Sequence, residues 1–267
     1  MRNLSIYFHT AVSFSAPVTE HYFTLRCIPA DGPTQRMTSW SLQLQPAADF
    51  LLQRDGFGNR LTVGQLHAPH TSLAYTVRGS VQTDLSVRDC TPPRPVDCCP
   101  SPCTAPTNAL RTFLAALPLP KDPLARACLL SRAVSDHFLY TPGATDIHTT
   151  AGEAFALGKG VCQDYAQVLV ALCRLAGLPA RYVSGLPEGN GETHAWAEIF
   201  CSGAWYGLDP TRRCEADEGY VRLNVGREYA DCPIERGVFL GAAQQQQSVY
   251  MKVSAASVNA DSPESFL

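Results

Sequence analysis

Residues 158–186, GKGVCQDYAQVLVALCRLAGLPARYVSGL, place a cysteine at the point where a long apolar helix is expected to begin. Apolar side chains continue from Cys162 to Ala176, and Gly177 and Pro179 then supply a stop signal. The first turn of a helix has unpaired N–H groups and the positive end of the helix dipole, and both favour a thiolate over a thiol. The sequence therefore predicts a nucleophilic cysteine at a helix N-terminus, whose N–H groups are also suited to stabilise an oxyanion.

A cysteine nucleophile needs a base and a group that orients the base, and two downstream segments supply them. His194 lies in GETHAWAEIF, and Asp209 lies in WYGLDPT. These are neighbouring extended runs joined near CSGA, so a hairpin is predicted. With a two-residue turn at Ser202–Gly203, or at Cys201–Ser202, the two side chains lie on the same face of the hairpin. A three-residue loop would shift one strand by one residue and weaken this argument. The sequence therefore predicts that Asp209 holds the imidazole of His194.

Four further residues close to this cysteine or preceding its helix have predicted roles. Tyr140, in HFLYTPG, and Gln163 are candidates to support an oxyanion. Asp164 lies in the first turn of the predicted helix, where a capping role suits it better than chemistry. Cys173 lies inside the apolar body of the helix and is predicted to be a core residue.

Composition argues against several classes of protein. The chain has 267 residues with 45% hydrophobic content, enough for one large domain or two modest ones. Its 21 Lys and Arg nearly balance 24 Asp and Glu, and no basic run favours a nucleic-acid surface. The N-terminus lacks the apolar core of a secretory signal, and no stretch approaches the roughly 18 apolar residues of a membrane span. We expect a soluble cytoplasmic protein with no nucleic-acid or membrane partner, and its oligomeric state stays open.

Three regions follow one another along the chain. Residues 1–89 contain strand-like runs separated by turn signals such as DGFGN, which predicts a small β-sandwich-like or barrel-like domain. Residues 90–106, CTPPRPVDCCPSPCTAP, are so rich in proline that they predict a linker. Residues 107–267 begin with helical periodicity and continue with extended runs. This order predicts an α+β catalytic domain in which helices pack on an antiparallel sheet.

The eleven cysteines do not predict a disulfide scaffold, because the number is odd and reduced thiols are the rule in the cytoplasm. Four of them could chemically bind zinc, namely Cys90, Cys98, Cys99 and Cys103. Their spacing is not that of a zinc knuckle, and no EF-hand loop predicts calcium. No metal or cofactor is predicted, and zinc in this segment stays an open alternative.

The three segments that carry Cys162, His194 and Asp209 together resemble the bacterial transglutaminase-like superfamily, whose members are often described as candidate cysteine proteases. The later stretch YVRLNVGREYADCPIERGVFLG is similar to the family's C-terminal signature. The early stretches PVTEHYFTLRCIPADGPTQRM and DGFGN are similar to the β-domain that often precedes its core. The resemblance covers nearly the whole chain except the cysteine-rich residues 90–103. It implies a papain-like or transglutaminase-like core with a Cys162–His194–Asp209 triad.

The chemistry that the resemblance implies is thiol-dependent acyl transfer on amide bonds through a thioester. Hydrolysis of a peptide or isopeptide is the leading hypothesis, with a peptide or protein as substrate. Protein-glutamine transamidation is the alternative within the same chemistry, because an amine can replace water. A non-catalytic peptide-binding module is the alternative from another class. The natural substrate and the role of the β-domain stay open.

Overall fold

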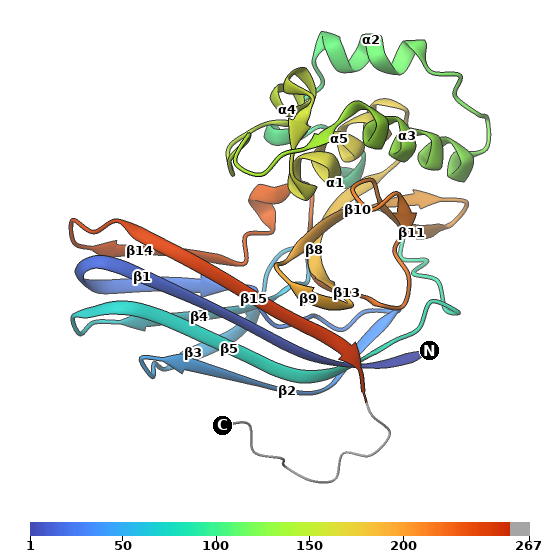
Figure 1. Cartoon of the computed structure of the whole chain (residues 1–267). Coiled ribbons are helices and arrows are strands. Elements are labelled where there is room, and N and C mark those ends of the chain that lie inside the picture. Colours follow the sequence, from blue (N-terminus) through green and yellow to red (C-terminus); the bar gives the residue numbers. More distant parts are fainter. Residues whose placement is uncertain (257–267) are drawn as a thin grey trace.

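The computed structural model describes residues 1–256, which form two main sheets and a group of helices (Figure 1). The strands are β1 (Arg2–Leu25), β2 (Gln35–Gln45), β3 (Phe50–Arg54), β4 (Arg60–Leu66), β5 (His70–Thr83), β6 (Leu139–Tyr140), β7 (Lys159–Gly160), β8 (Ala180–Pro187), β9 (Gly189–Gly191), β10 (His194–Cys201), β11 (Ala204–Asp209), β12 (Cys214–Glu215), β13 (Tyr220–Gly226), β14 (Glu235–Leu240) and β15 (Gln245–Ala255). The helices are α1 (Pro95–Cys98), α2 (Asn108–Ala116), α3 (Pro123–His137), α4 (Ala151–Leu157) and α5 (Cys162–Leu175), with 3₁₀ turns η1 (Pro102–Thr104) and η2 (Tyr229–Asp231).

The first sheet is organised around the long strand β1, whose side chains largely alternate between buried and more exposed positions. The first half of β1 pairs antiparallel with β5 and β15, and its second half pairs with β4 and β14. The pairing with β5 shifts register between Ser13 and Val18, around Pro17. Proline lacks an N–H donor, so an interruption of the ladder is expected there. The predicted strand-rich N-terminal region is confirmed.

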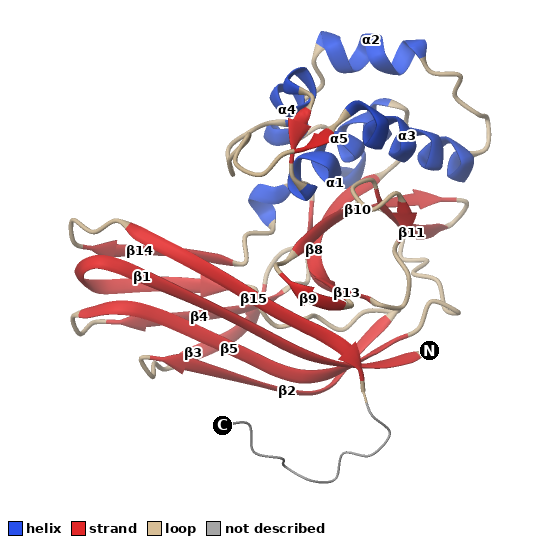
Figure 2. Cartoon of the chain, viewed as in Figure 1, coloured by secondary structure: helices blue, strands red, loops and turns tan. Residues whose placement is uncertain are grey.

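The second sheet is antiparallel in the order β12-β11-β10-β8-β13, and the helices gather on one side of it (Figure 2). Helix α5 packs on β10 and β8 and is buried almost throughout its length. Its apolar side chains, with those of α3 and α4, form one core with the inner face of the sheet, and Cys173 lies in this core. The predicted α+β class, with helices packed on an antiparallel sheet, is confirmed.

The C-terminal strands differ from the predicted division of the chain. Strands β14 and β15 pair with β1 in the first sheet, although the sequence analysis placed residues 235–255 with the second region. Met251 and Val253 of β15 are buried in the same cluster as Leu4 and Ile6 of β1. An alternating strand fits any sheet that buries one face, so its partner cannot be read from its own residues.

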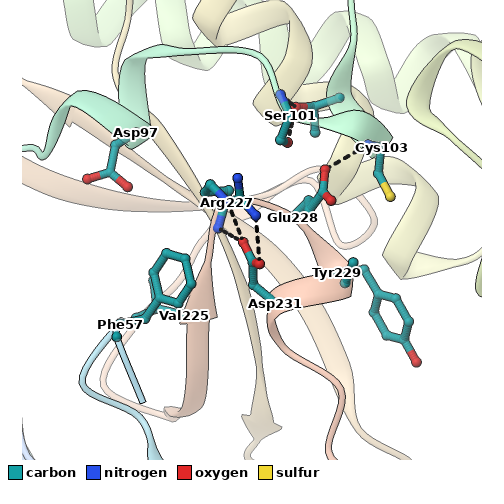
Figure 3. A network of polar contacts seen from close by, with 12 residues as sticks. Phe57, Asp97, Ser101, Cys103, Val225, Arg227, Glu228, Tyr229 and Asp231 are labelled. Atoms are coloured by element: carbon teal, nitrogen blue, oxygen red, sulfur yellow. Dashed lines mark hydrogen bonds and ion pairs between the residues drawn. The ribbon is translucent and has the colours of Figure 1, made fainter. Parts of the chain in front are cut away.

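The predicted linker is docked on the second region. Its short elements α1 and η1 carry the buried residues Asp97, Ser101 and Thr104. Arg174, near the end of α5, donates hydrogen bonds to the hydroxyls of Ser101 (3.3 Å) and Thr104 (2.9 Å) and to the Asp97 carbonyl (3.2 Å). Figure 3 shows this segment beside the chain that follows β13. These contacts hold the segment against the end of α5.

Candidate active site

The turn that leads into α5 is built by two glycines and one carboxylate. Gly158 ends α4 with a left-handed φ of 62°, a conformation that glycine adopts without steric cost. A Cβ at Gly160 would overlap the side chain of Asp164, so only glycine fits there. Asp164 Oδ2 accepts the Val161 N–H (2.8 Å) and the Thr145 hydroxyl (2.7 Å). Asp164 therefore caps the helix, as predicted.

Cys162 is the first residue of α5, directly after the extended N-cap residue Val161. The predicted helix start is therefore confirmed. Because the N–H groups of the first helical turn lack partners in the preceding turn, the sulfur lies beside a cluster of donors.

The hairpin β10–β11 brings His194 and Asp209 together. Its turn is Ser202–Gly203, with Cys201 opposite Ala204, and both turn residues have positive φ (50° and 88°). Positive φ at both positions is the mark of a tight two-residue hairpin turn. His194 Nε2 donates to Asp209 Oδ2 at 2.6 Å, so the predicted two-residue turn places imidazole and carboxylate in direct contact.

Asp209 is fully buried and accepts four hydrogen bonds. Oδ1 accepts the N–H groups of Thr211 and Arg212, each at 3.0 Å, and Oδ2 accepts the Tyr220 hydroxyl at 2.9 Å as well as the His194 ring. Burial alone would raise the pKa of Asp209, but the hydrogen bond and charge of His194, with the other donors, lower it. The carboxylate is therefore held as an anion.

His194 is held as a cation over a wide pH range. Burial disfavours the charged ring, but hydrogen bonds with Asp209 and Cys162 outweigh it and raise the pKa of His194 to about 9. Since Nε2 is bonded to Asp209, Nδ1 is the nitrogen left for the sulfur. An imidazole held in this way is suited to give and take a proton beside a thiol.

A cavity of about 500 Å³ opens above these residues. Cys162 and His194 both line it, and Asp209 lies behind the ring. Tyr140 and Gln163, the two predicted oxyanion donors, line it too. The Gln163 amide donates to the Asp146 carbonyl at 3.4 Å, and burial, with the nearby Cys162 and Glu192, raises the pKa of the Tyr140 hydroxyl. The cavity thus gathers all the predicted site residues except Asp209.

The sequence analysis did not identify two parts of this site. Tyr220 contacts Asp209 from β13, and its ring packs edge-on against Trp196. Part of the cavity wall comes from β1, β14 and β15 of the first sheet. Tyr220 stands at the start of YVRLNVG, a strand-like run in which nothing local marks a tyrosine as a partner of the site.

Among residues 1–256, no group of three or more histidine, cysteine or acidic side chains is arranged to hold a metal ion, and this includes the four cysteines of residues 90–103. In the same residues, no helix combines the length and apolar character needed to cross a membrane.

Comparison with known sequences identifies the family. Residues 115–210 match the transglutaminase-like superfamily, and residues 4–82 match the bacterial transglutaminase-like N-terminal region. An uncharacterized protein of Mycobacterium tuberculosis is 32% identical over 274 residues, which cover 86% of this chain and 85% of the relative. The chain belongs to the transglutaminase-like superfamily. Members of this superfamily are cysteine-dependent acyltransferases or proteases, so the assignment supports a cysteine-dependent enzyme.

Two further relatives bear on this transglutaminase-like chain. A candidate cysteine protease from Cytophaga hutchinsonii superposes with a TM-score of 0.78 over 100% of this chain and 94% of its own, at 20% identity, which shows the shared fold. A protein-glutamine gamma-glutamyltransferase of Pseudomonas aeruginosa is 34% identical over 119 residues, which cover 39% of this chain and 17% of that protein. The similarity to the Pseudomonas protein therefore concerns only a part of each chain.

Proposed function

We propose that this protein is a thiol-dependent enzyme that acts on amide bonds through Cys162, and that hydrolysis of a peptide or isopeptide is its reaction. The observation that supports this most directly is the 2.6 Å contact between His194 and Asp209 at the cavity that Cys162 lines. A non-catalytic peptide-binding module would not require a buried carboxylate that keeps an imidazole charged next to a thiol.

The proposed reaction uses each of these residues. The sulfur of Cys162 attacks the amide carbonyl carbon, and the N–H groups at the start of α5 stabilise the oxyanion. His194, protonated at neutral pH, gives its proton to the leaving amine as the C–N bond breaks, and a thioester remains on Cys162. Water then attacks the thioester while His194 takes its proton. The carboxylic acid product leaves as the C–S bond breaks, and the thiolate and the protonated imidazole are restored.

Transamidation is the second candidate, because the relative from Pseudomonas aeruginosa is named a protein-glutamine gamma-glutamyltransferase. In that case a primary amine attacks the same thioester in place of water. We favour hydrolysis because polar residues that water can hydrate line the cavity, among them Gln163, Asn190 and Gln247.

An electrophilic amide-mimic probe tests the proposal. We expect it to label the wild-type protein at Cys162, to label Cys162→Ala not at all, and to label His194→Ala slower by orders of magnitude. Labelling that persists at other cysteines with an unchanged rate in both variants would contradict the assignment.

A labelled primary amine, offered together with a glutamine-containing protein, separates the two reactions. Release of a free carboxylate without incorporation of the amine is the result expected for hydrolysis. Incorporation with release of ammonia would establish transamidation instead. A cytoplasmic location and a peptide or protein substrate stay predictions.

A further inference from the structure

The first sheet contributes a wall of polar and apolar side chains to the cavity of the candidate site. Thr10 of β1, Glu235 of β14 and Gln247 of β15 line this cavity together with Cys162. Three strands therefore bring side chains to it from sequence positions far before and after the helix that carries the cysteine. The β-domain is part of the substrate site in this arrangement.

This wall contains one buried hydroxyl group, that of Thr10. Thr10 is fully buried, and within residues 1–256 its hydroxyl makes no hydrogen bond. The hydroxyl of Tyr75, on β5, lies behind this wall and next to both Thr10 and Glu235. A buried hydroxyl without a partner is unfavourable. A polar group that approaches the Glu235 carboxyl from the cavity would offer the Thr10 hydroxyl a partner.

Glu235 supplies a carboxyl group at the same place. It is partly buried, and its Oε2 accepts a hydrogen bond from the Gln247 amide at 3.3 Å. Within the described part of the chain it forms no ion pair with lysine, arginine or histidine. Burial raises the pKa of Glu235, while the nearby Tyr75 hydroxyl lowers it. A cationic group of a ligand would offset the free-energy cost of burying the charged carboxylate.

The other charges around the cavity are of both signs, and the positive ones, His194 and Arg212, come from the second sheet and the turn that follows β11. Glu192 adds a second carboxylate among the lining residues. The guanidinium of Arg212 also lines the cavity, but it lies 5.7 Å from the centre of the Tyr220 ring, on the side of Asp209. The wall formed by the first sheet has no basic side chain among its lining residues. An acidic substrate group would meet repulsion there, and an ammonium or guanidinium group would be attracted.

We propose that Glu235, with Thr10 and Gln247, forms a subsite that binds a basic side chain of the peptide substrate near the scissile amide. This rests on the proposed function, because it names the substrate class of the same site. The carboxylate would accept the N–H groups of the cation, the Thr10 hydroxyl would act as a second acceptor, and the Gln247 amide would hold the carboxylate in place.

Peptide vinyl sulfones test the subsite through labelling of Cys162. Acetylated tripeptide probes would carry lysine at one of their three positions, and each would be paired with a norleucine counterpart that lacks only the ammonium. We expect one lysine probe to label the wild type about tenfold faster than its partner, and Glu235→Gln to abolish that preference. Equal rates for all pairs, or a preference that survives in Glu235→Gln, would refute the subsite.

Two controls test whether the lysine preference depends on Glu235 itself and not on net charge or stability. Glu20→Gln removes the same charge from a surface carboxylate that pairs with His67 outside the cavity, and it should keep the lysine preference. Thermal unfolding of Glu235→Gln should match that of the wild type, and Thr10→Val provides a second variant whose preference should fall.

A binding measurement without chemistry completes the test. Cadaverine should shift NMR resonances of β14 and β15 in Cys162→Ala, and the added substitution Glu235→Gln should weaken this binding about tenfold. If no probe labels Cys162 but cadaverine binds in this way, the proposed reaction fails and the cation subsite stands. If Cys162 is labelled while cadaverine binds both proteins equally or neither, the subsite fails and the reaction stands.

Discussion

Asp209 connects the parts of the candidate site at the level of single side chains. One of its oxygens is held by two backbone N–H groups, and the other receives His194 and Tyr220. Because the backbone donors fix one oxygen, the direction of the other is fixed as well. The carboxylate thus sets the orientation of the imidazole and keeps its proton. Replacing it would leave the ring with neither a partner nor a charge to balance it.

The raised pKa of His194 gives a direct test at this scale. In an NMR titration, the His194 ring should titrate near pH 9, and Asp209→Asn should lower this value because the hydrogen bond with the carboxylate is the largest single favourable contribution. Since the pKa is raised on folding, the protonated ring stabilises the protein fully below about pH 6.5 and loses this contribution as the pH rises through about 9. The change in unfolding free energy should be about 3 kcal/mol. A ring that titrates near 6.5 in the folded wild type would contradict the geometry.

Tyr220 is a positioning residue in this arrangement, because it contacts Asp209 and not the cavity sulfur. Tyr220→Phe removes one hydrogen bond to the Asp209 carboxylate, worth about 1.5–3 kcal/mol, and keeps the ring against Trp196. We expect labelling of Cys162 to slow by up to about tenfold and the pKa of His194 to rise, because the oxygen that accepts its proton loses a competing donor. A loss of stability with an unchanged pH profile would show instead that the tyrosine only supports packing.

The residues of the turn before α5 form one interdependent structural unit. Its glycines, its N-cap residue and Asp164 depend on one another, because the space beside Gly160 is filled by the carboxylate that caps Val161. The position of Cys162 is therefore set by backbone geometry that a few neighbouring residues determine.

Gly160→Ala should disturb this turn. The added methyl group would push Asp164 away from the N–H that it caps, and we expect a loss of about 1–3 kcal/mol in unfolding free energy together with slower labelling of Cys162. Gly56→Ala is the matched control, since a Cβ there would meet no atom within 4 Å and φ is not left-handed. If both variants unfold alike, the close approach at Gly160 is not needed.

Arg174 ties the docked segment 90–106 to the end of α5. Besides the three bonds to that segment, its guanidinium donates to the carbonyls of Ala180 (2.8 Å) and Arg227 (2.9 Å). Figure 3 shows Arg227 and Ser101 near each other at this junction. One buried side chain thus joins the docked segment, the start of β8 and the chain that follows β13.

Arg174→Met should break this junction. The acceptors left buried without a donor should cost about 3 kcal/mol or more, and limited proteolysis should cut within residues 90–106. Arg111→Met on the exposed face of α2 removes the same charge and should change neither measurement. Resistance to proteolysis in Arg174→Met would show that other contacts hold the segment.

At the scale of the whole molecule, the two sheets contribute side chains to one hydrophobic cluster. Leu186, Val221 and Leu223 of the second sheet are buried in the same cluster as residues of β1 and β15. Strand β9, just before His194, pairs with β15, so the first sheet also holds the loop that leads to the candidate base. The β-domain and the helical region therefore depend on each other for packing.

This shared core predicts one cooperative unfolding transition for the whole chain. Near-UV circular dichroism and tryptophan fluorescence should follow the same thermal curve. Truncation after residue 234 removes β14 and β15, and we expect that protein to lose the transition and the labelling of Cys162. Two separate transitions, or a truncated protein that is labelled at the wild-type rate, would contradict this coupling.

The sequence by itself determined the start of α5 and a hairpin in which either two-residue turn brings His194 and Asp209 to one face, and the structure selected the turn Ser202–Gly203. These features depend on local chemistry, namely glycines, a capping carboxylate and the two-residue periodicity of a hairpin, which act over a few neighbouring residues. Only the tertiary structure decided that residues 235–255 return to β1, that residues 90–106 dock on α5, and that Tyr220 and Glu235 reach the site. The physical reason is that an alternating strand or a short polar segment can satisfy several partners. The choice among them depends on packing between residues far apart in the chain.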